Sequence, residues 1–195
     1  MDGSCDGKIH VHDVRTGAIE QVFSYAGEMI EELSCSANGQ TWIFLQQPTV
    51  RPVENFCDAP YISVWNWPLA SPRLIELSFD NVDAAVISPN GEWLAVSGYC
   101  RSQQQTFLRL LDLAGRCVQE LAIDRCKGLR WSPCGTVIGR IGEQEIAVHL
   151  AKNLAQSKTF SLQYPSAVAF TPDLSYIALG SWTGGVVQPF DPVMS

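Results

Sequence analysis

The stretch that decides the fold is Ala84-Ala85-Val86-Ile87-Ser88-Pro89-Asn90-Gly91-Glu92-Trp93-Leu94-Ala95-Val96. It holds two short apolar runs, 84–87 and 93–96, on either side of a tetrapeptide of turn-forming residues. Proline presets the φ angle that a turn needs, and asparagine and glycine accept a positive φ, so the tetrapeptide reverses the chain. The stretch therefore predicts an antiparallel hairpin, with one strand before Ser88 and the other after Gly91.

The same punctuation recurs three more times along the chain. The fourth positions of the four turns are residues 39, 91, 135 and 174, which are 52, 44 and 39 residues apart. A period of roughly 40 to 50 residues is typical of proteins built from repeated multi-stranded units. The further copies are Ser36-Ala37-Asn38-Gly39, Ser132-Pro133-Cys134-Gly135 and Thr171-Pro172-Asp173-Leu174.

A second marker, downstream of each turn, keeps the same period. Here an alternating strand ends in a recurrent pair of residues, and the copies are 53, 46, 38 and 41 residues apart. A fourth strand follows the pair, as in 19–23, 74–79 and 117–123. Each repeat thus holds four strands, and the sequence predicts an all-β fold of four-stranded antiparallel units with almost no helix. The pairs are His12-Asp13, Trp65-Asn66, Leu111-Asp112, His149-Leu150 and Phe190-Asp191.

One copy carries a more specific resemblance. The stretch Asp6-Gly7-Lys8-Ile9-His10-Val11-His12-Asp13-Val14-Arg15-Thr16-Gly17 resembles the third strand and Trp-Asp dipeptide of a WD repeat, with His12 in the Trp place. The chain is therefore similar to β-propellers of the WD-repeat superfamily and to YVTN or quinoprotein-like propellers. Its turns also resemble those of TolB-like and peptidase-associated propellers. It departs from regular WD repeats in two ways. Among the recurrent pairs, only Trp65-Asn66 has the tryptophan of the Trp-Asp dipeptide, and no Gly-His pair begins a repeat. The resemblance implies about four to five propeller blades and a role as a binding scaffold.

The repeat boundaries give complete blades at 28–80, 81–124 and 125–163, with partial blades at 1–27 and 164–195. Both ends of the chain offer a third strand, Lys8 to Asp13 and Gly185 to Asp191, so the two ends cannot complete one shared blade. We therefore expect an open or incomplete ring with unpaired strand edges at Ile9 to Val11 or at Val186 to Gln188. Such a chain is either a fragment of a larger propeller or a protein whose edges pair with another chain.

Composition narrows the class of protein. The 195 residues are 46% hydrophobic with a net charge of −7, and residues 1–98 hold 13 acidic against 4 basic side chains. Nucleic-acid binding is disfavoured because it needs clustered basic residues, and the triplet Arg125, Lys127 and Arg130 is interpreted as a solvated rim. No apolar run is long enough to span a membrane. Seven cysteines without a Cys-x-x-Cys pair favour reduced thiols and a cytoplasmic protein, with most of the thiols buried.

The candidate chemistry is sparse. The sequence contains no Gly-x-Ser-x-Gly elbow, phosphate loop or His-Glu-x-x-His motif. His10 and His12 share one face of a strand, and His149 could be a third metal ligand, but His12 and His149 hold the repeat position of a packing residue. Trp42, Trp93 and Trp131 are interpreted as packing residues too. We therefore predict no enzyme activity, no cofactor and no metal.

Two unusual loops between second and third strands supply the candidate site. Residues 46–60 and 99–105 replace short turns, and they carry the aromatic and arginine side chains that anchor protein interfaces. We expect a scaffold that binds a protein or peptide there, through Arg51, Phe56, Tyr99 and Arg101. The alternative is the propeller domain of a larger peptidase or glycosidase whose catalytic part lies outside this chain.

Overall fold

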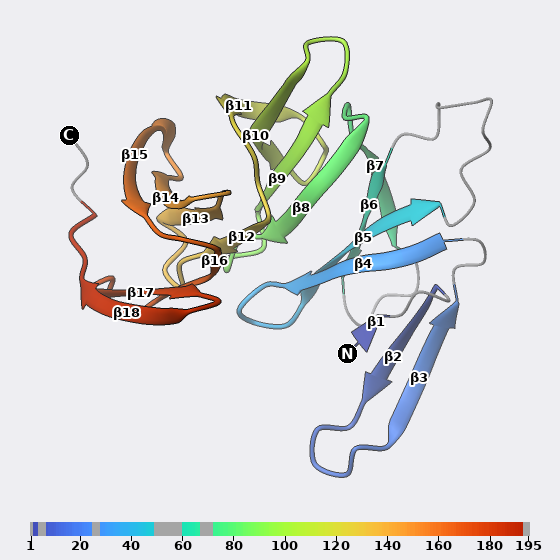
Figure 1. The fold of residues 1–195 in the computed structure, drawn as a ribbon. Helices are drawn as coiled ribbons and strands as arrows, with labels where there is room; N and C mark the ends of the chain where they lie inside the picture. Colours follow the sequence, from blue (N-terminus) through green and yellow to red (C-terminus); the bar gives the residue numbers. More distant parts are fainter. Residues whose placement is uncertain (1, 4–6, 25–27, 49–59, 67–71, 193–195) are drawn as a thin grey trace.

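The computed structural model describes residues 2–3, 7–24, 28–48, 60–66 and 72–192. Within these ranges the chain forms β-strands and turns and no helix, as the sequence predicts. The strands assemble into five antiparallel sheets, numbered 1 to 5 in chain order, and none of them closes on itself (Figure 1).

Each sheet is a meander in which consecutive strands are neighbours. Sheet 1 holds β1 (Asp2–Gly3), β2 (Lys8–His12) and β3 (Ile19–Ser24). Sheet 2 holds β4 (Glu28–Cys35), β5 (Thr41–Pro48), β6 (Tyr61–Asn66) and β7 (Arg73–Glu76). Sheet 3 holds β8 (Asn81–Ile87), β9 (Trp93–Cys100), β10 (Gln105–Asp112) and β11 (Cys117–Ile123). Sheet 4 holds β12 (Gly128–Trp131), β13 (Val137–Ile141), β14 (Glu145–Leu150) and β15 (Asn153–Ser161). Sheet 5 holds β16 (Pro165–Phe170), β17 (Tyr176–Ser181) and β18 (Gly184–Pro189).

The deciding stretch forms the expected hairpin. Val86 of β8 faces Ala95 of β9, and the meander continues through β10 to β11. The recurrent pairs lie at or just after the ends of β2, β6, β10, β14 and β18, which are the third strands of the repeat. In sheets 1, 3 and 4 a β-bulge interrupts the ladder to the fourth strand at this point. The second marker of the sequence thus coincides with a change of register, which increases the local twist of the strand.

The apolar core lies between the sheets, because alternate side chains of each strand point to opposite neighbours. Separate clusters fill the gaps between successive sheets, and aromatic side chains, including Phe44 and Trp65, fill the gap between sheets 1 and 2. The period-2 alternation of the strands predicts that nine of their apolar residues are buried. Eight of them are buried, and the ninth, Phe170, is only half-buried. The eight buried residues are Val86, Leu94, Val96, Leu108, Leu110, Val168, Ile177 and Leu179.

The five sheets follow one another along an arc, and sheets 1 and 5 lie at its two ends (Figure 1). The first strands β4, β8, β12 and β16 contact one another in succession along this arc. Of the two edges at which the sequence predicts unpaired groups, the one at Ile9 is covered, because Ile9 pairs with Gly3 of the short strand β1 on one side and with Phe23 on the other. At the other end, β18 pairs with β17 and with no further strand among the described residues.

Gly139 of β13 tests how tightly sheets 4 and 5 pack. A Cβ at this position would lie 2.8 Å from Val168 Cγ1 and 3.2 Å from Phe170 Cζ. We expect Gly139→Ala to lower the free energy of unfolding by about 1–3 kcal/mol, as overpacking does, in denaturant titrations.

Gly128→Ala in β12 is the matched control. Its added Cβ would meet only Ile141 Cδ1, at an ordinary 3.4 Å. Equal stabilities of the two variants would contradict the close approach of the two sheets.

Candidate functional site

At least one aromatic residue borders each of the four repeated turns between first and second strands. In sheet 3, Ser88 Oγ accepts the N–H of Trp93 at 2.9 Å, and Gly91 takes a φ of 75°. Gly39 and Gly135 adopt the same conformation, and Leu174 adopts it with a φ of 58°. The turns of neighbouring sheets also contact each other, since the N–H of Ala37 donates to the carbonyl of Pro89 at 2.8 Å.

A large hollow lies at this turn end, between sheets 3 and 4. It has a volume of about 880 Å³, and most of its wall is apolar. Val118 is half-exposed on one wall, and polar groups such as Asn90 and Lys152 stand at its margin. We call this hollow the tryptophan groove, after Trp93 and Trp131 on its walls. Its lining also includes Leu110, Gln119, Gly135, Thr136, Leu150, Ala151, Gln156 and Pro192.

Gln119 and Trp131 fix the two walls of the tryptophan groove relative to each other. The amide of Gln119, on β11, donates to the carbonyl of Ala151 at 2.7 Å and accepts the N–H of Leu154 at 2.9 Å. The indole N–H of Trp131, on β12, donates to the carbonyl of Val86 at 3.3 Å. A groove held by hydrogen bonds from both sides keeps its shape without a ligand, which lowers the entropy cost of binding.

The predicted loop site is described only in part. Arg51 and Phe56 lie outside the described residues. Tyr99 belongs to β9 and not to a loop, because β9 continues to Cys100 and the connecting loop is shortened to residues 101–104. Arg101 lies in that loop, where its backbone N–H donates to the Asp80 carboxylate at 2.7 Å.

Tyr99 lines a second, polar hollow of about 530 Å³ at the loop end of sheet 3. Its wall carries the carboxylates of Asp83 and Asp124 and the guanidinium of Arg125. Partial desolvation raises the pKa of Asp83, and a hydrogen bond from Asn81 and the charge of Arg125 oppose this shift. The structure therefore places Tyr99 beside acidic groups, with a surrounding chemistry quite different from that of the tryptophan groove.

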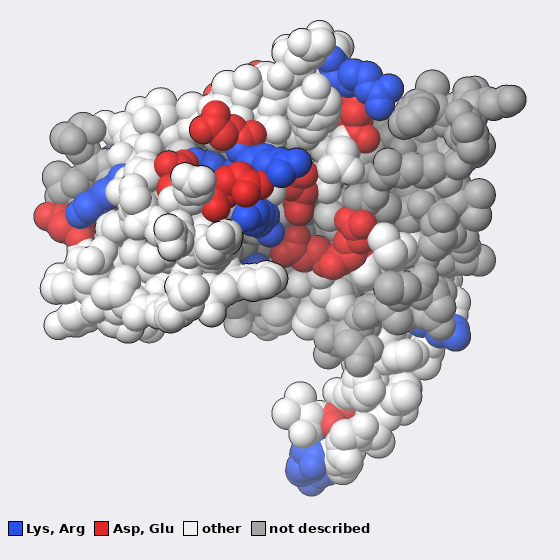
Figure 2. Space-filling view, in the orientation of Figure 1, with Lys and Arg blue, Asp and Glu red and all other residues white. Residues whose placement is uncertain are grey.

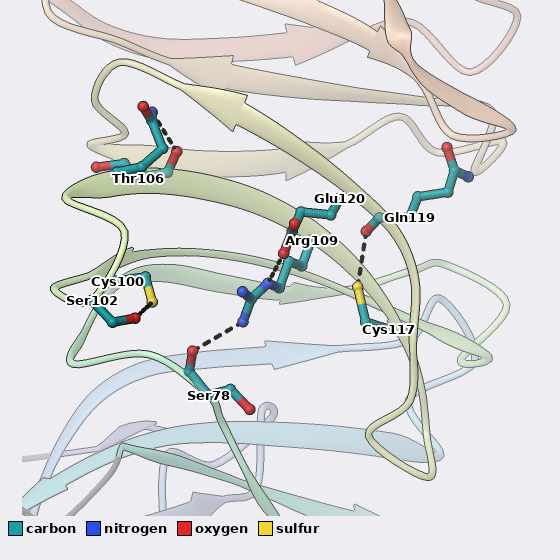
Figure 3. A network of polar contacts seen from close by, with 9 residues as sticks. Ser78, Cys100, Ser102, Thr106, Arg109, Cys117, Gln119 and Glu120 are labelled. Atoms are coloured by element: carbon teal, nitrogen blue, oxygen red, sulfur yellow. Dashed lines mark hydrogen bonds and ion pairs between the residues drawn. The ribbon is translucent and has the colours of Figure 1, made fainter.

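Arg109 anchors the link that precedes sheet 3. Figure 3 shows its guanidinium between Glu120 and the backbone of Ser78. The distances are 2.6 Å to the Glu120 carboxylate and 3.0 Å to the Ser78 carbonyl, and the guanidinium lies 4.2 Å from the centre of the Phe79 ring. Arginine suits this place because its planar head can stack on a ring and donate in two directions at once.

Charged side chains of both signs are mixed on the face shown in Figure 2, and they form no patch of a single sign there. Arg125 and Lys127 both pair with Glu143, at 2.9 and 3.2 Å. Arg130 lies 3.7 Å from Glu32. The triplet that the sequence suggested as a solvated rim is thus engaged in ion pairs with other sheets and loops.

The histidines are not brought together. The rings of His10 and His12 lie 6.1 Å apart on sheet 1, whereas His149 is buried in sheet 4. Nδ1 of His149 lies 2.9 Å from the carbonyl oxygen of Leu154, and it must donate because a carbonyl only accepts. His12 makes the equivalent contact to Gly17, at 3.4 Å. Over the described residues, no three His, Cys, Asp or Glu side chains converge as metal ligands would.

The prediction that most of the thiols are buried is wrong in the described part of the chain. Cys126 alone is buried there, and burial raises the pKa of its thiol to about 11. Cys35, Cys117 and Cys134 are exposed and Cys100 is half-buried, because they stand at strand ends and in turns. Cys5 and Cys57 lie outside the described residues.

Sequence reasoning missed the tryptophan groove. It treated Trp93 and Trp131 only as packing residues, and both do pack against the core between sheets 3 and 4. The available signal was their position, since each directly borders a repeated turn.

A scan of the sequence against models of protein families finds no match, and a search of curated proteins finds no similar sequence. Within the described ranges, no helix has the length and apolar character that a membrane crossing requires.

The buried His149 should make stability depend on pH. Burial lowers the pKa of His149 from its ordinary value of 6.5, and the hydrogen bond to Leu154 opposes this shift only in part. Below pH 6.5 the unfolded chain therefore binds a proton that the folded chain resists, so the free energy of unfolding falls as the pH drops. We expect His149→Phe, which installs the residue type found at Phe190 in the same repeat position, to flatten this fall.

The measurement is the free energy of unfolding by denaturant at several pH values from about 7.5 down to about 5.5. An identical pH dependence in the wild type and the His149→Phe variant would show that His149 titrates normally in the fold.

Proposed function

We propose that this chain is an open, WD-repeat-like β-propeller segment that acts as a non-catalytic scaffold and binds an extended peptide of a partner protein. The support for the propeller is the order of the sheets. Each is an antiparallel meander, the first strands contact one another along an arc, and the core lies between successive sheets. This is how blades pack in a propeller.

The observation that carries the binding function is the tryptophan groove. Its apolar lining comes from Trp93, Leu110 and Val118 of sheet 3 and from Trp131 of sheet 4. These residues offer anchors for apolar side chains. Its volume of about 880 Å³ suits a short stretch of peptide. Tryptophan is enriched among the residues that contribute most to protein interfaces. The exposed Lys152 at the margin favours a peptide that places an acidic residue beside its apolar anchors.

The loop site remains part of the same proposal. Tyr99 and Arg101 are candidates for a second contact, at the end of sheet 3 opposite its repeated turn. Arg51 and Phe56, which lie outside the described residues, stay candidates on the sequence alone. A partner that carries both contacts engages both ends more tightly than either alone, because the second contact then forms within the complex at a high effective concentration.

The variant Val118→Lys tests whether peptides bind in the tryptophan groove. Binding peptides are first selected from a random linear library with the wild-type protein as target, and they are then labelled for fluorescence polarisation. We expect peptides with apolar anchors, and we expect Val118→Lys to weaken their binding at least tenfold, because it places a charge on an apolar wall. Val118 is 47% exposed, so the change should leave the fold intact.

Leu74→Lys is the matched control, because Leu74 is 59% exposed on β7, the strand of sheet 2 that corresponds to β11. It should bind the peptides like the wild type. A loss of binding in Tyr99→Ala but not in Val118→Lys would move the site to the loop end. Failure to recover any peptide would overturn the scaffold proposal.

A further inference from the structure

One wall of the tryptophan groove is built by an irregular part of sheet 4. The register between β14 and β15 shifts next to His149, so that the ladder skips residues 154–156 of β15. A β-bulge of this kind lacks the ladder hydrogen bonds that hold a regular strand. The shape of the wall therefore depends on what else holds the bulge. The bulge and the turn before it contribute Leu150, Ala151, Lys152 and Gln156 to the groove.

Two side chains hold the bulge through the backbone of Leu154, which is itself buried. Gln119 of β11 accepts the N–H of Leu154 at 2.9 Å. Nδ1 of His149, on β14, donates to the carbonyl of Leu154, also at 2.9 Å. The bulge is thus fixed from two sides, by sheet 3 through Gln119 and by its own sheet through His149.

The surroundings of His149 suit the neutral ring and not the charged one. Nε2 is buried, and no described residue forms a hydrogen bond with it. Burial lowers the pKa of His149 and the charge of Arg140, on β13, lowers it further, whereas the bond to Leu154 and the charge of Glu145, on β14, raise it. A proton on Nε2 would be a buried charge without an acceptor, which is costly. A protonated ring is therefore more stable outside this place than in it.

We propose that the tryptophan groove binds its peptide in a pH-dependent way, because protonation of His149 releases the bulge at 154–156. This inference rests on the proposed function, since it assigns a mode of regulation to the same groove. When the ring leaves its place, the carbonyl of Leu154 loses its donor. The bulge and the turn before it can then move, and the wall no longer matches the peptide. The partner is held near neutral pH and released in mildly acidic surroundings.

The test measures peptide affinity by fluorescence polarisation at about pH 7.5 and about pH 5.5. It uses selected peptides that contain no histidine. If the released ring has the ordinary pKa of 6.5, this change of pH shifts the balance toward the released state by up to about tenfold. We expect the wild type to lose about three- to tenfold in affinity.

His149→Asn separates the titration of the ring from its hydrogen bond. An asparagine amide can donate to the carbonyl of Leu154 as Nδ1 does, but it does not titrate in this range. Its affinity should therefore change by less than about twofold between the two pH values. His149→Phe, which also removes the titration, gives the same result if His149→Asn does not fold.

His12→Asn is the matched control. His12 makes the equivalent contact in sheet 1, where its Nδ1 lies 3.4 Å from the carbonyl oxygen of Gly17. This variant should keep the full pH dependence of the wild type. Circular dichroism should show intact sheets in the wild type at about pH 5.5. Global unfolding there would overturn the proposal, because the loss of binding would then not be a property of the groove.

NMR tests the same inference without any peptide. The backbone resonances of Ala151 to Gln156 should titrate with the same midpoint as the ring of His149, and they should not titrate in His149→Asn. A wild-type affinity that is equal at both pH values, or a pH dependence that persists in His149→Asn, would overturn the proposal. Absence of peptide binding near pH 7.5 would count against the proposed function alone, and the NMR titration would still decide whether His149 controls the bulge.

Discussion

The arrangement of the sheets depends on how the inner edge of β8 is satisfied. As the first strand of sheet 3, β8 has a free edge, and unpaired buried N–H groups would be costly. The preceding sheet supplies the missing acceptors from β4. The Glu32 carboxylate accepts the N–H of Ala85 at 2.9 Å, and the Ser34 hydroxyl accepts that of Ile87 at 3.3 Å. Burial raises the pKa of Glu32, and the hydrogen bond from Ala85 and the charge of the nearby Arg130 oppose this shift. Side chains of sheet 2 thereby accept the backbone hydrogen bonds that the edge strand of sheet 3 has no neighbouring strand to accept.

The candidate binding surface follows from this constraint. Trp131 of β12 also reaches β8, at the carbonyl of Val86, so sheets 2, 3 and 4 are tied to a single strand. With β12 fixed, the repeated turns of sheets 3 and 4 stand at a set distance, and the tryptophan groove opens between them. Gln119 closes the outer side of this arrangement through its two bonds to β15 and the turn before it. A rigid groove between rigid sheets can select a peptide by shape, because little conformational freedom is lost on binding.

The sequence predicted what is encoded locally. The turn at Ser88 to Gly91, its three copies and the four strands of sheet 3 all follow from residues that are neighbours in the chain. The groove could not be predicted, because its walls come from different repeats, and the bond from Ala85 to Glu32 joins residues 53 positions apart. Tyr99 was misplaced in a loop since the strand signal fades at its polar end. The short strand β1 has too few residues to show a pattern.

The most direct test of this account is the hydrogen exchange of the Ala85 and Ile87 amides, resolved residue by residue by NMR. If side chains of β4 complete the edge of β8, both amides exchange slowly, and Ser34→Ala accelerates Ile87 while leaving Ala85 protected. An open edge would instead exchange as fast as the amides of an unfolded chain. Fast exchange of both amides in the wild-type protein would contradict the claim that successive sheets are held together by side chains that satisfy each other's backbone.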